Sequence, residues 1–246
     1  MQVPEPTSPS RNDPSTGLPI GPEVDDPSPA APPGDRVRAG RWARLEPLDP
    51  SVHADDLFEA STPPDADARF TYLPVPAPDN RSTFDRWLDQ TCQPGVDRRY
   101  DAVIDQTTGR AVGRQAYLRI DPANRSVELG DVYWGPAMAR TRLATEAFFL
   151  AASHVFDDLG YRRFEWKCDS LNGPSRRAAQ RFGFSYEGTF RRAVIYKGRS
   201  RDTTWYSMLD EEWPTIRAGF QRWLDPANFD GAGRQLHALR ARPETG

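Results

Sequence analysis

The side chains best suited to chemistry stand close together in the middle of the sequence. Glu128 and Asp131 carry carboxylates that could accept a proton from a reacting group. Arg140 and Arg142 follow at the start of a predicted helix, where backbone N–H groups and guanidinium groups can bind phosphate oxygens. Residues of these types could take part in proton transfer and in the binding of a phosphate-bearing ligand.

Each of these residues also has a purely structural interpretation. A separation of three positions places Glu128 and Asp131 on opposite faces of an ideal strand, so that one alone faces a cleft unless a bulge intervenes. Either carboxylate could instead form an ion pair with one of the many arginines. Arg140 and Arg142 could be ordinary solvated residues at a helix start.

The cysteines and histidines favour neither a metal site nor a disulfide framework. Cys92 and Cys168 are the two cysteines, too few for a thiolate cage, and such low usage is typical of a reducing compartment. His53, His154 and His237 have no ligand-like spacing, so we expect each to be a surface or packing residue. We therefore expect no metal cofactor.

Composition sets the broad class of protein. The chain has 246 residues and a formal net charge of −3, which argues against a general nucleic-acid binder. Residues 1–35 are rich in Pro, Ser, Asp and Gly, and we expect a disordered tail because they contain almost no apolar run. The sequence has neither the features of a secretory signal nor a stretch long enough to span a membrane. We therefore expect a cytoplasmic protein without a membrane partner.

Hydrophobic periodicity, prolines and turn residues predict the elements of the first half of the chain. The short TTGR and DPANRS turns predict that the last three of its strands form an antiparallel meander. The elements are a strand at 37–49, a helix at 51–61, an ordered loop without helix at 63–79, a helix at 80–91, and strands at 99–105, 111–121 and 126–134.

The second half begins with the longest predicted helix, at 139–159. Its apolar residues keep one stripe, which predicts packing on the sheet, and the helix connects two parallel strands. Asn172 is the expected cap of the next helix, with Pro174 in its first turn and Gly183 at its end. The remaining elements are strands at 162–168, 185–196 and 202–209, helices at 172–183 and 213–224, and a tail that frays.

This order of elements and three motifs resemble the GNAT superfamily of N-acetyltransferases. VELGDVYWGPAMARTRLATEAF resembles the strand and pyrophosphate-binding helix of the RimJ/RimL ribosomal-protein N-acetyltransferases. NGPSRRAAQRFGFSYEGTFRR resembles their Asn-x-x-Ser helix, and YLPVPAPD is similar to their Tyr-Leu-Pro loop. Together these motifs extend the resemblance over residues 36–213.

The resemblance implies the GNAT fold. This is an α/β (α+β) fold with a mixed, mostly antiparallel central sheet of about seven strands, flanked by helices and splayed at strands four and five. The implied organisation is a disordered tail at 1–35, the acetyltransferase domain at 36–213, and a C-terminal helix with a frayed tail at 214–246.

The resemblance also implies acetyl-CoA as the acyl donor. Its diphosphate would be bound at the helix start that corresponds to the family's Gln/Arg-x-x-Gly-x-Gly/Ala loop. This sequence departs from the pattern at two positions of that loop, where alanine and arginine replace the first and fourth residues. The arginines could supply additional phosphate contacts, or they could block the loop so that CoA binding is lost. The residues of the implied loop are Ala139, Arg140, Thr141, Arg142, Leu143 and Ala144.

Catalytic roles follow from the same resemblance. A carboxylate in the strand before the loop would act as the base, and we prefer Glu128 to Asp131. The backbone N–H of Val132 or Tyr133 would stabilise the tetrahedral intermediate.

Two residues of the Asn-x-x-Ser helix would assist the donor. Ser175 corresponds to a serine proposed in RimL-like enzymes to donate a hydrogen bond to the departing thiolate, and Asn172 lies close to CoA in the family. Both also have a local alternative, as a hydroxyl in a first helical turn and as an N-cap.

The acceptor would enter between the loop at 70–78 and the final hairpin. Aromatic residues at strand spacing more often belong to a core than to a pocket, so only some of those near this entrance would contact the acceptor. The candidates are Phe70, Tyr72, Trp134, Tyr196 and Trp205.

The implied function is the transfer of an acetyl group from acetyl-CoA to a primary amine by direct attack in a ternary complex. The amine would belong to a small molecule or to a protein N-terminus. Two alternatives stay open: a non-catalytic module that binds CoA or a partner, and transfer of another acyl group such as succinyl. Because dimers are common among relatives, we also consider a homodimer.

Overall fold

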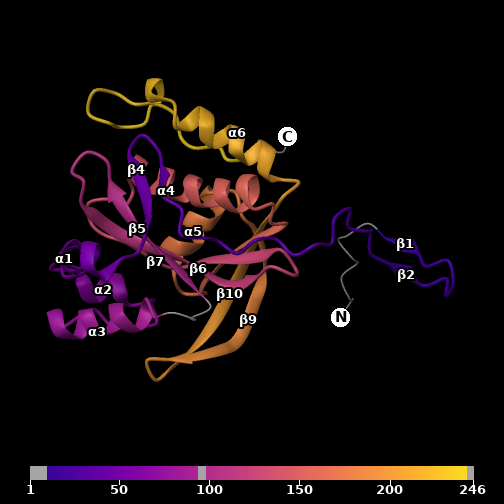
Figure 1. Cartoon of the computed structure of the whole chain (residues 1–246), viewed down its shortest axis with the longest axis horizontal. Coiled ribbons are helices and arrows are strands. Elements are labelled where there is room, and N and C mark those ends of the chain that lie inside the picture. Colours follow the sequence, from indigo (N-terminus) through magenta and orange to yellow (C-terminus); the bar gives the residue numbers. More distant parts are fainter. Residues whose placement is uncertain (1–9, 94–97, 243–246) are drawn as a thin grey trace.

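The computed structural model describes residues 10–93 and 98–242. In this part of the chain the body is an eight-stranded sheet with the strand order β3-β4-β5-β6-β7-β8-β10-β9 (Figure 1). The strands are β1 (Arg11–Asn12), β2 (Pro19–Ile20), β3 (Arg38–Ala39), β4 (Ala43–Pro47), β5 (Arg99–Asp105), β6 (Ala111–Asp121), β7 (Ser126–Trp134), β8 (Arg163–Asp169), β9 (Ser185–Tyr196) and β10 (Arg199–Leu209). The α-helices are α1 (Pro50–Ser61), α2 (Ala66–Phe70), α3 (Arg81–Thr91), α4 (Arg142–Ser153), α5 (Gly173–Arg181) and α6 (Trp213–Trp223).

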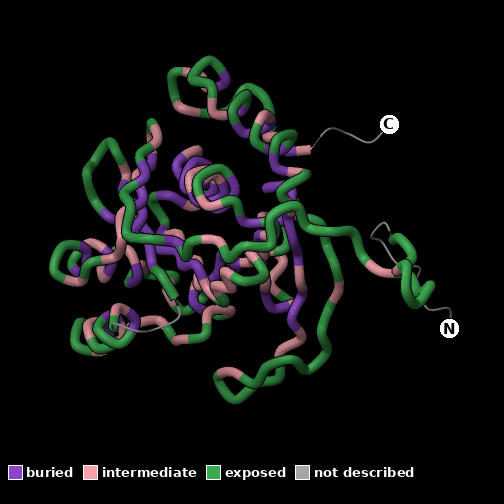
Figure 2. The backbone as a smooth tube through the Cα atoms, turned by 45° about the vertical axis from the view of Figure 1, so that its right-hand side comes forward, coloured by how far each residue is buried: buried purple, intermediate pink, exposed green. Residues whose placement is uncertain are grey.

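Alternation along the strands divides the apolar residues between two cores. On β5, Val103 belongs to the larger core with α4, α5 and α6, whereas its neighbours Ala102 and Ile104 belong to the smaller core with α1 and α3. Successive strand residues point to opposite faces, so the two sets of helices cover opposite faces of the sheet. Figure 2 shows the buried segments gathered in the sheet and in the helices that pack on it.

The fold that the resemblance implied is confirmed. β5, β6 and β7 form the predicted antiparallel meander, and α4 connects β7 to its parallel neighbour β8. Pairing between β7 and β8 is confined to residues 126–128 although β7 continues to Trp134, so the two strands separate as expected. The sheet has one strand more than expected because the short β3 pairs with β4.

A buried carboxylate fastens α4 to the first long strand of the sheet. Glu146 is 5% exposed, and its two oxygens accept hydrogen bonds from the backbone N–H groups that lead into β4. The donors are Arg41, Trp42 and Ala43, at 2.9, 2.6 and 2.7 Å. A Cβ at Gly40 would lie 2.3 Å from the carboxyl carbon of Glu146, so this close approach requires glycine.

The loop at 63–79 was predicted to contain no helix, and this prediction is wrong. α2 lies within it. Pro63 and Pro64 precede α2 and Pro74 follows it, so the prolines confine a short helix without interrupting it.

The longest helix begins three residues later than predicted and changes form at its end. Ala139 N–H donates to the carbonyl oxygen of Gly135 at 3.0 Å, and Arg140 has a φ of +65°, so the chain turns before α4 begins. Residues His154–Asp158 are π-helical. The predicted apolar stripe is nevertheless buried against the sheet.

The final hairpin has a tighter turn than predicted. Lys197 and Gly198 both have positive φ, +48° and +70°, which is typical of a two-residue hairpin turn. β10 therefore begins at Arg199, three residues before the predicted start.

Both terminal segments contact the body of the protein where the structure describes them. β1 and β2 form a hairpin that extends away from the body, yet Arg125 binds the Asp26 carboxylate and the Ser28 carbonyl oxygen, both at 2.8 Å (Figures 1 and 2). After α6 the chain folds back, and Arg242 pairs with Glu212 at 2.7 Å. The expectations of disorder before residue 36 and of fraying after 224 stay predictions. Residues 1–9 and 243–246 lie outside the described residues, and the domain boundaries stay predictions.

Two further observations concern membranes and metals. No helix in the described part of the chain combines the length and the apolar character needed to cross a membrane. Across residues 10–93 and 98–242, no group of three or more His, Cys, Asp and Glu side chains is arranged to hold a metal ion. Cys92 and Cys168 are free thiols.

Candidate active site

A cavity of about 450 Å³ opens where β7 and β8 separate. Its walls come from these two strands, the start of α5, the β9–β10 hairpin and the segment after α2. The structure therefore brings the three predicted catalytic side chains to one cavity. The predicted site residues that line it are Tyr72, Glu128, Asp131, Val132, Asn172, Ser175 and Trp205.

A β-bulge explains why both carboxylates reach this cavity. Gly130 pairs with Ala116 and Tyr133 pairs with Arg114, so two residues of β7 lie opposite one residue of β6. Asp131 occupies the bulge with a φ of +43°. The extra residue breaks the alternation of the strand, so Glu128 and Asp131 both line the cavity, as expected from the sequence if a bulge intervened.

Glu128 is already bound by two cations. The side chain is 4% exposed, and its Oε2 atom accepts from Arg119 and lies 3.2 Å from Lys167 Nζ. Lys167 also pairs with Glu165 at 2.6 Å. Burial raises the pKa of Glu128, against the opposing effect of the two cations. The ion-pair alternative is therefore confirmed for this residue.

Asp131 has one oxygen bound and one oxygen unpartnered. Tyr100 donates its hydroxyl to Asp131 Oδ2 at 2.6 Å, and burial raises the pKa of Tyr100, so the hydroxyl keeps its proton. Asp131 Oδ1 is buried and accepts no hydrogen bond from the described residues. Since buried polar atoms normally find a partner, this oxygen is the acceptor that the cavity offers to a ligand.

The start of α5 presents a hydroxyl to the cavity. Asn172 Oδ1 accepts from Ser175 N–H at 3.1 Å, which confirms the predicted cap. Trp166 Nε1 donates to Ser175 Oγ at 2.9 Å. Because the indole N–H occupies a lone pair of Oγ, Ser175 can direct its own proton to another acceptor in the cavity.

The start of α4 offers unpaired backbone amides. The N-cap Thr141 directs its hydroxyl to the carbonyl oxygen of Met138 at 2.7 Å, and it makes no side-chain hydrogen bond to the helix. In the described part of the chain, no group accepts from the backbone N–H of Arg142, Leu143 or Ala144. Such a helix start can bind phosphate.

The two arginines of this segment have different environments. Arg140 is exposed, in the left-handed conformation. Arg142 lies with its guanidinium carbon 4.8 Å from the ring centre of Trp42 and 5.4 Å from that of Phe229, so it packs against the C-terminal segment. A phosphate contact from the side chain stays a prediction, and the exposed Arg140 is better placed for it.

Several predicted aromatic residues lie outside the cavity. Phe70 is buried with its ring centre 4.7 Å from that of Tyr133, and Tyr133 donates its hydroxyl to the carbonyl oxygen of Ala60 at 2.6 Å. Trp134 donates to Gln115 Oε1 at 3.3 Å. Neither Phe70, which is buried, nor Trp134, which is half-buried, lines this cavity, and their contact with the acceptor stays a prediction.

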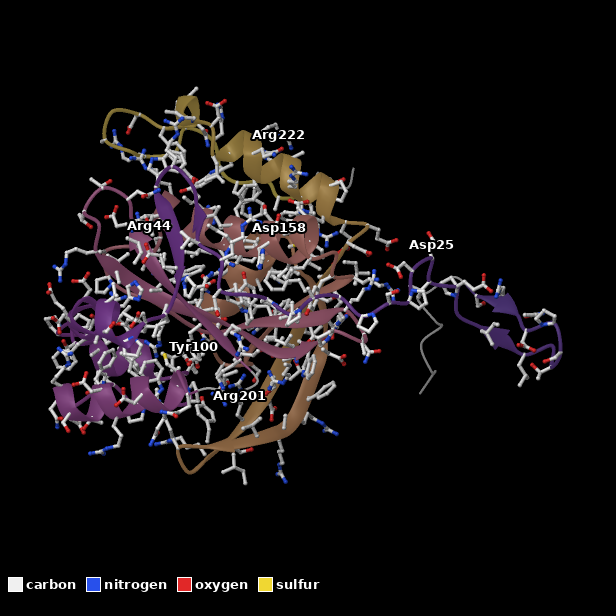
Figure 3. The ribbon with its side chains drawn as sticks, in the orientation of Figure 1. Asp25, Arg44, Tyr100, Asp158, Arg201 and Arg222 are labelled. Atoms are coloured by element: carbon white, nitrogen blue, oxygen red, sulfur yellow. The ribbon has the colours of Figure 1, made fainter. Side chains whose placement is uncertain are left out.

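Strand β10 contributes buried polar atoms to the cavity; of their residues, Trp205 was predicted from the sequence, whereas Arg201 and Thr203 were not. Arg201 Nε, Thr203 Oγ1 and Trp205 Nε1 are buried, line the cavity and have no hydrogen-bond partner in the described part of the chain. Arg201 and Tyr100 are both labelled in Figure 3, in the region between α3 and the β9–β10 hairpin. The alternation of the three residues was a visible signal, since positions 201, 203 and 205 share one face of a strand.

The hairpin tip contacts the opposite wall of the cavity. Lys197 Nζ donates to the carbonyl oxygen of Phe70 at 2.7 Å, at the end of α2. The contact joins the hairpin, which supplies Phe190 and Val194 to the cavity, to the segment that supplies Tyr72.

Comparison with known proteins assigns the family. The family described as "Acetyltransferase (GNAT) domain" matches residues 43–185, which is more than half of the chain. The chain belongs to the GNAT acetyltransferases. The matched residues of this GNAT domain include the bulged strand, the start of α4 and the start of α5.

Solved structures and one curated relative resemble this GNAT protein. A GCN5-related N-acetyltransferase from Brucella melitensis is 50% identical, with a TM-score of 0.84 over 86% of this chain and 96% of that chain. A probable acetyltransferase of the GNAT family from Chromobacterium violaceum is 38% identical, with a TM-score of 0.74 over 80% and 98%. A candidate ribosomal N-acetyltransferase, YdaF of Bacillus subtilis, is 28% identical over 106 residues, which span 43% of this chain and 57% of the relative.

Proposed function

We propose that this GNAT protein transfers the acetyl group of acetyl-CoA to a primary amine by direct attack in a ternary complex. The observation that supports this most is that the unpartnered Asp131 Oδ1 and the Ser175 hydroxyl belong to residues that line the same cavity. The carboxylate oxygen suits an incoming amine, and the hydroxyl suits a departing sulfur.

The residues present fit the acyl donor. The unpaired amides of residues 142–144 stand at the positive end of the α4 dipole, where a diphosphate is stabilised, and Arg140 is exposed beside them. Acetyl-CoA would supply a thioester. Val132 lines the cavity at the bulge, so its backbone N–H is the proposed donor to the thioester oxygen. Tyr133 suits this role less well, since it pairs with Arg114 in the sheet.

Asp131 is the proposed acceptor of the amine proton. An alkylamine is protonated near neutral pH, since the reference pKa of lysine is about 10.4. Attack on the thioester requires the neutral amine, and Asp131 Oδ1 is a buried carboxylate oxygen of this cavity that has no hydrogen-bond partner among the described residues. Glu128 instead holds Arg119 and Lys167. This assignment reverses the preference drawn from the sequence.

Direct transfer is favoured over an acyl-cysteine intermediate. Cys168 lines the cavity, but burial raises its pKa, so the thiol form prevails and is a poor nucleophile. Ser175 would donate a hydrogen bond to the thiolate that leaves. A serine hydroxyl is too weak an acid for full proton transfer, so its contribution is stabilisation of the developing charge.

A protein N-terminus is the proposed acceptor to test first. The unpaired donors of Arg201, Thr203 and Trp205 repeat along one strand face and match the carbonyl oxygens of an extended peptide. The name of the relative YdaF, a candidate ribosomal N-acetyltransferase, points the same way. Such a reaction would take place in the cytoplasm.

Calorimetry with acetyl-CoA, followed by thiol-release assays on peptides with free N-termini and on small amines, tests the proposal. Saturable release that depends on the amine is the expected result. Binding without release would favour a non-catalytic CoA-binding module, and faster release from succinyl-CoA would assign another acyl group. Absence of any acyl-CoA binding would refute the proposal.

A further inference from the structure

A second cavity, of about 240 Å³, is lined by α3, by the segment at 75–78 and by Arg114 of β6. Its walls are largely apolar and include Val75, Pro76, Phe84 and Trp87. The adjoining residues 72–74 line the first cavity, so one continuous segment of chain borders both.

The wall of this second cavity contains a buried guanidinium. Arg114 is 1% exposed, and its guanidinium carbon lies 4.2 Å from the ring centre of Trp87 and 5.2 Å from that of Tyr133. Its Nε and Nη1 atoms are buried and find no acceptor in the described part of the chain. Within those same residues, no carboxylate forms an ion pair with it.

This arrangement leaves two donor atoms of a buried cation without an acceptor in the described part of the chain. Burying a charged side chain costs free energy unless it is paired and hydrogen-bonded. The aromatic rings offset part of that cost through cation–π contacts but accept no conventional hydrogen bond. The missing element is an anion that reaches the guanidinium from the cavity.

Arg38 shows how the same chain treats another buried arginine. Its side chain is also in the interior, and its Nε and Nη1 atoms likewise lack partners in the described part of the chain, but its Nη2 lies 2.5 Å from the carboxylate of Asp101. Arg38 therefore forms an ion pair with a carboxylate of the chain, whereas Arg114 lines a cavity.

We propose that the second cavity binds a small apolar carboxylate, with the carboxylate at Arg114 and the apolar body against Trp87 and Phe84. Charge-assisted hydrogen bonds supply the specificity for the acid, and the rings supply the contact area. This proposal is independent of the proposed acetyl transfer. Binding to the second cavity can be measured without acyl-CoA.

Phenylacetate and its neutral isostere phenylacetamide are matched probes for this site. Ligand-observed NMR titrations of the full chain should give a dissociation constant at least about tenfold lower for the acid, since one charge-assisted hydrogen bond accounts for such a ratio. Arg114→Met should remove this preference. Equal binding of the two probes, or binding of neither, would overturn the proposal.

Two further variants keep the test decisive if Arg114→Met does not fold. Ala77→Trp fills the cavity from the loop and leaves Arg114 in place, so it should abolish phenylacetate binding. Arg86→Gln removes the exposed cation of the same cavity and should retain the preference for the acid. Retained phenylacetate binding in Ala77→Trp, or loss of the preference in Arg86→Gln, would assign the probe to another place and overturn the proposal.

Discussion

Tyr100 and Asp131 are joined by a 2.6 Å hydrogen bond between β5 and the bulge of β7, two strands that are separated in the sheet by β6. The bond fixes Oδ2 of the carboxylate, whereas Oδ1 has no hydrogen-bond partner in the described part of the chain. The position of the proposed base is therefore determined by a residue that lies 31 positions away in the sequence.

Replacing Asp131 tests the assignment of the base. Asp131→Asn should lower kcat by about 100-fold or more, the usual contribution of general base catalysis, and should leave acetyl-CoA affinity nearly unchanged. The matched control is Glu128→Gln, measured by steady-state kinetics and thermal unfolding. A larger loss of kcat in Glu128→Gln than in Asp131→Asn would return the role of base to Glu128.

Replacing Ser175 tests the assistance to the leaving group. Ser175→Ala should reduce turnover more than it weakens acetyl-CoA binding, because the hydroxyl acts on charge that develops on sulfur. Trp166→Phe should give a smaller effect in the same direction, since it removes the hydrogen bond that orients the hydroxyl. Equal losses in turnover and in affinity would contradict this role for Ser175.

The two arginines before and at the start of α4 should separate into a binding and a packing residue. Arg140→Ala should weaken acetyl-CoA binding by about tenfold, the loss of one charge-assisted contact, with little change in thermal stability. Arg142→Ala should lower the thermal midpoint, because its guanidinium packs on Trp42 and Phe229. Calorimetry and thermal unfolding of both variants check this, and the reverse pattern would exchange the two roles.

Glu146 should be one of the most sensitive positions for stability. Glu146→Ala leaves three backbone N–H groups without their acceptor and should cost about 3 kcal/mol or more of unfolding free energy. The control Glu211→Ala alters an exposed carboxylate and should cost less than about 0.5 kcal/mol. Urea unfolding of both variants measures the difference, and similar values would show that the contacts of Glu146 contribute little.

The buried His154 should make stability depend on pH. Burial lowers the pKa of His154, and its Nε2 atom has no partner in the described part of the chain. The unfolded chain then binds a proton more readily, so stability is complete above the unfolded pKa of about 6.5 and falls as the pH decreases below it. His154→Gln should flatten this dependence in urea unfolding between pH 7.5 and pH 5. An unchanged slope would assign the dependence to other groups.

Local sequence signals predicted the parts of the fold that local interactions determine. The strands at 99–105 and 126–134, the apolar stripe of α4 and the cap at Asn172 all appear in the structure. Each signal depends on residues a few positions apart, and the motifs of the resemblance added the splay between β7 and β8.

The contents of the site could not be predicted in the same way. The bulge at Asp131 depends on the register of β6 and β7, which no single strand encodes. An arginine in a strand is usually exposed, so the sequence did not predict the burial of Arg114. The ring of Trp87, from α3, covers its guanidinium. Glu128 was preferred as the base from the resemblance, and its two cations, Arg119 and Lys167, could not be predicted because they come from other strands.

The Lys197 contact with the end of α2 also limits the shape of the molecules that can be modified. It ties the hairpin to the far wall, so a bulky partner would need to detach the ammonium group before approaching sideways. If the proposed acetyl transfer is correct, this contact favours a slender chain end over a lysine on a broad folded surface. We therefore expect the width of the cavity entrance beside this contact to contribute to the selection among amines.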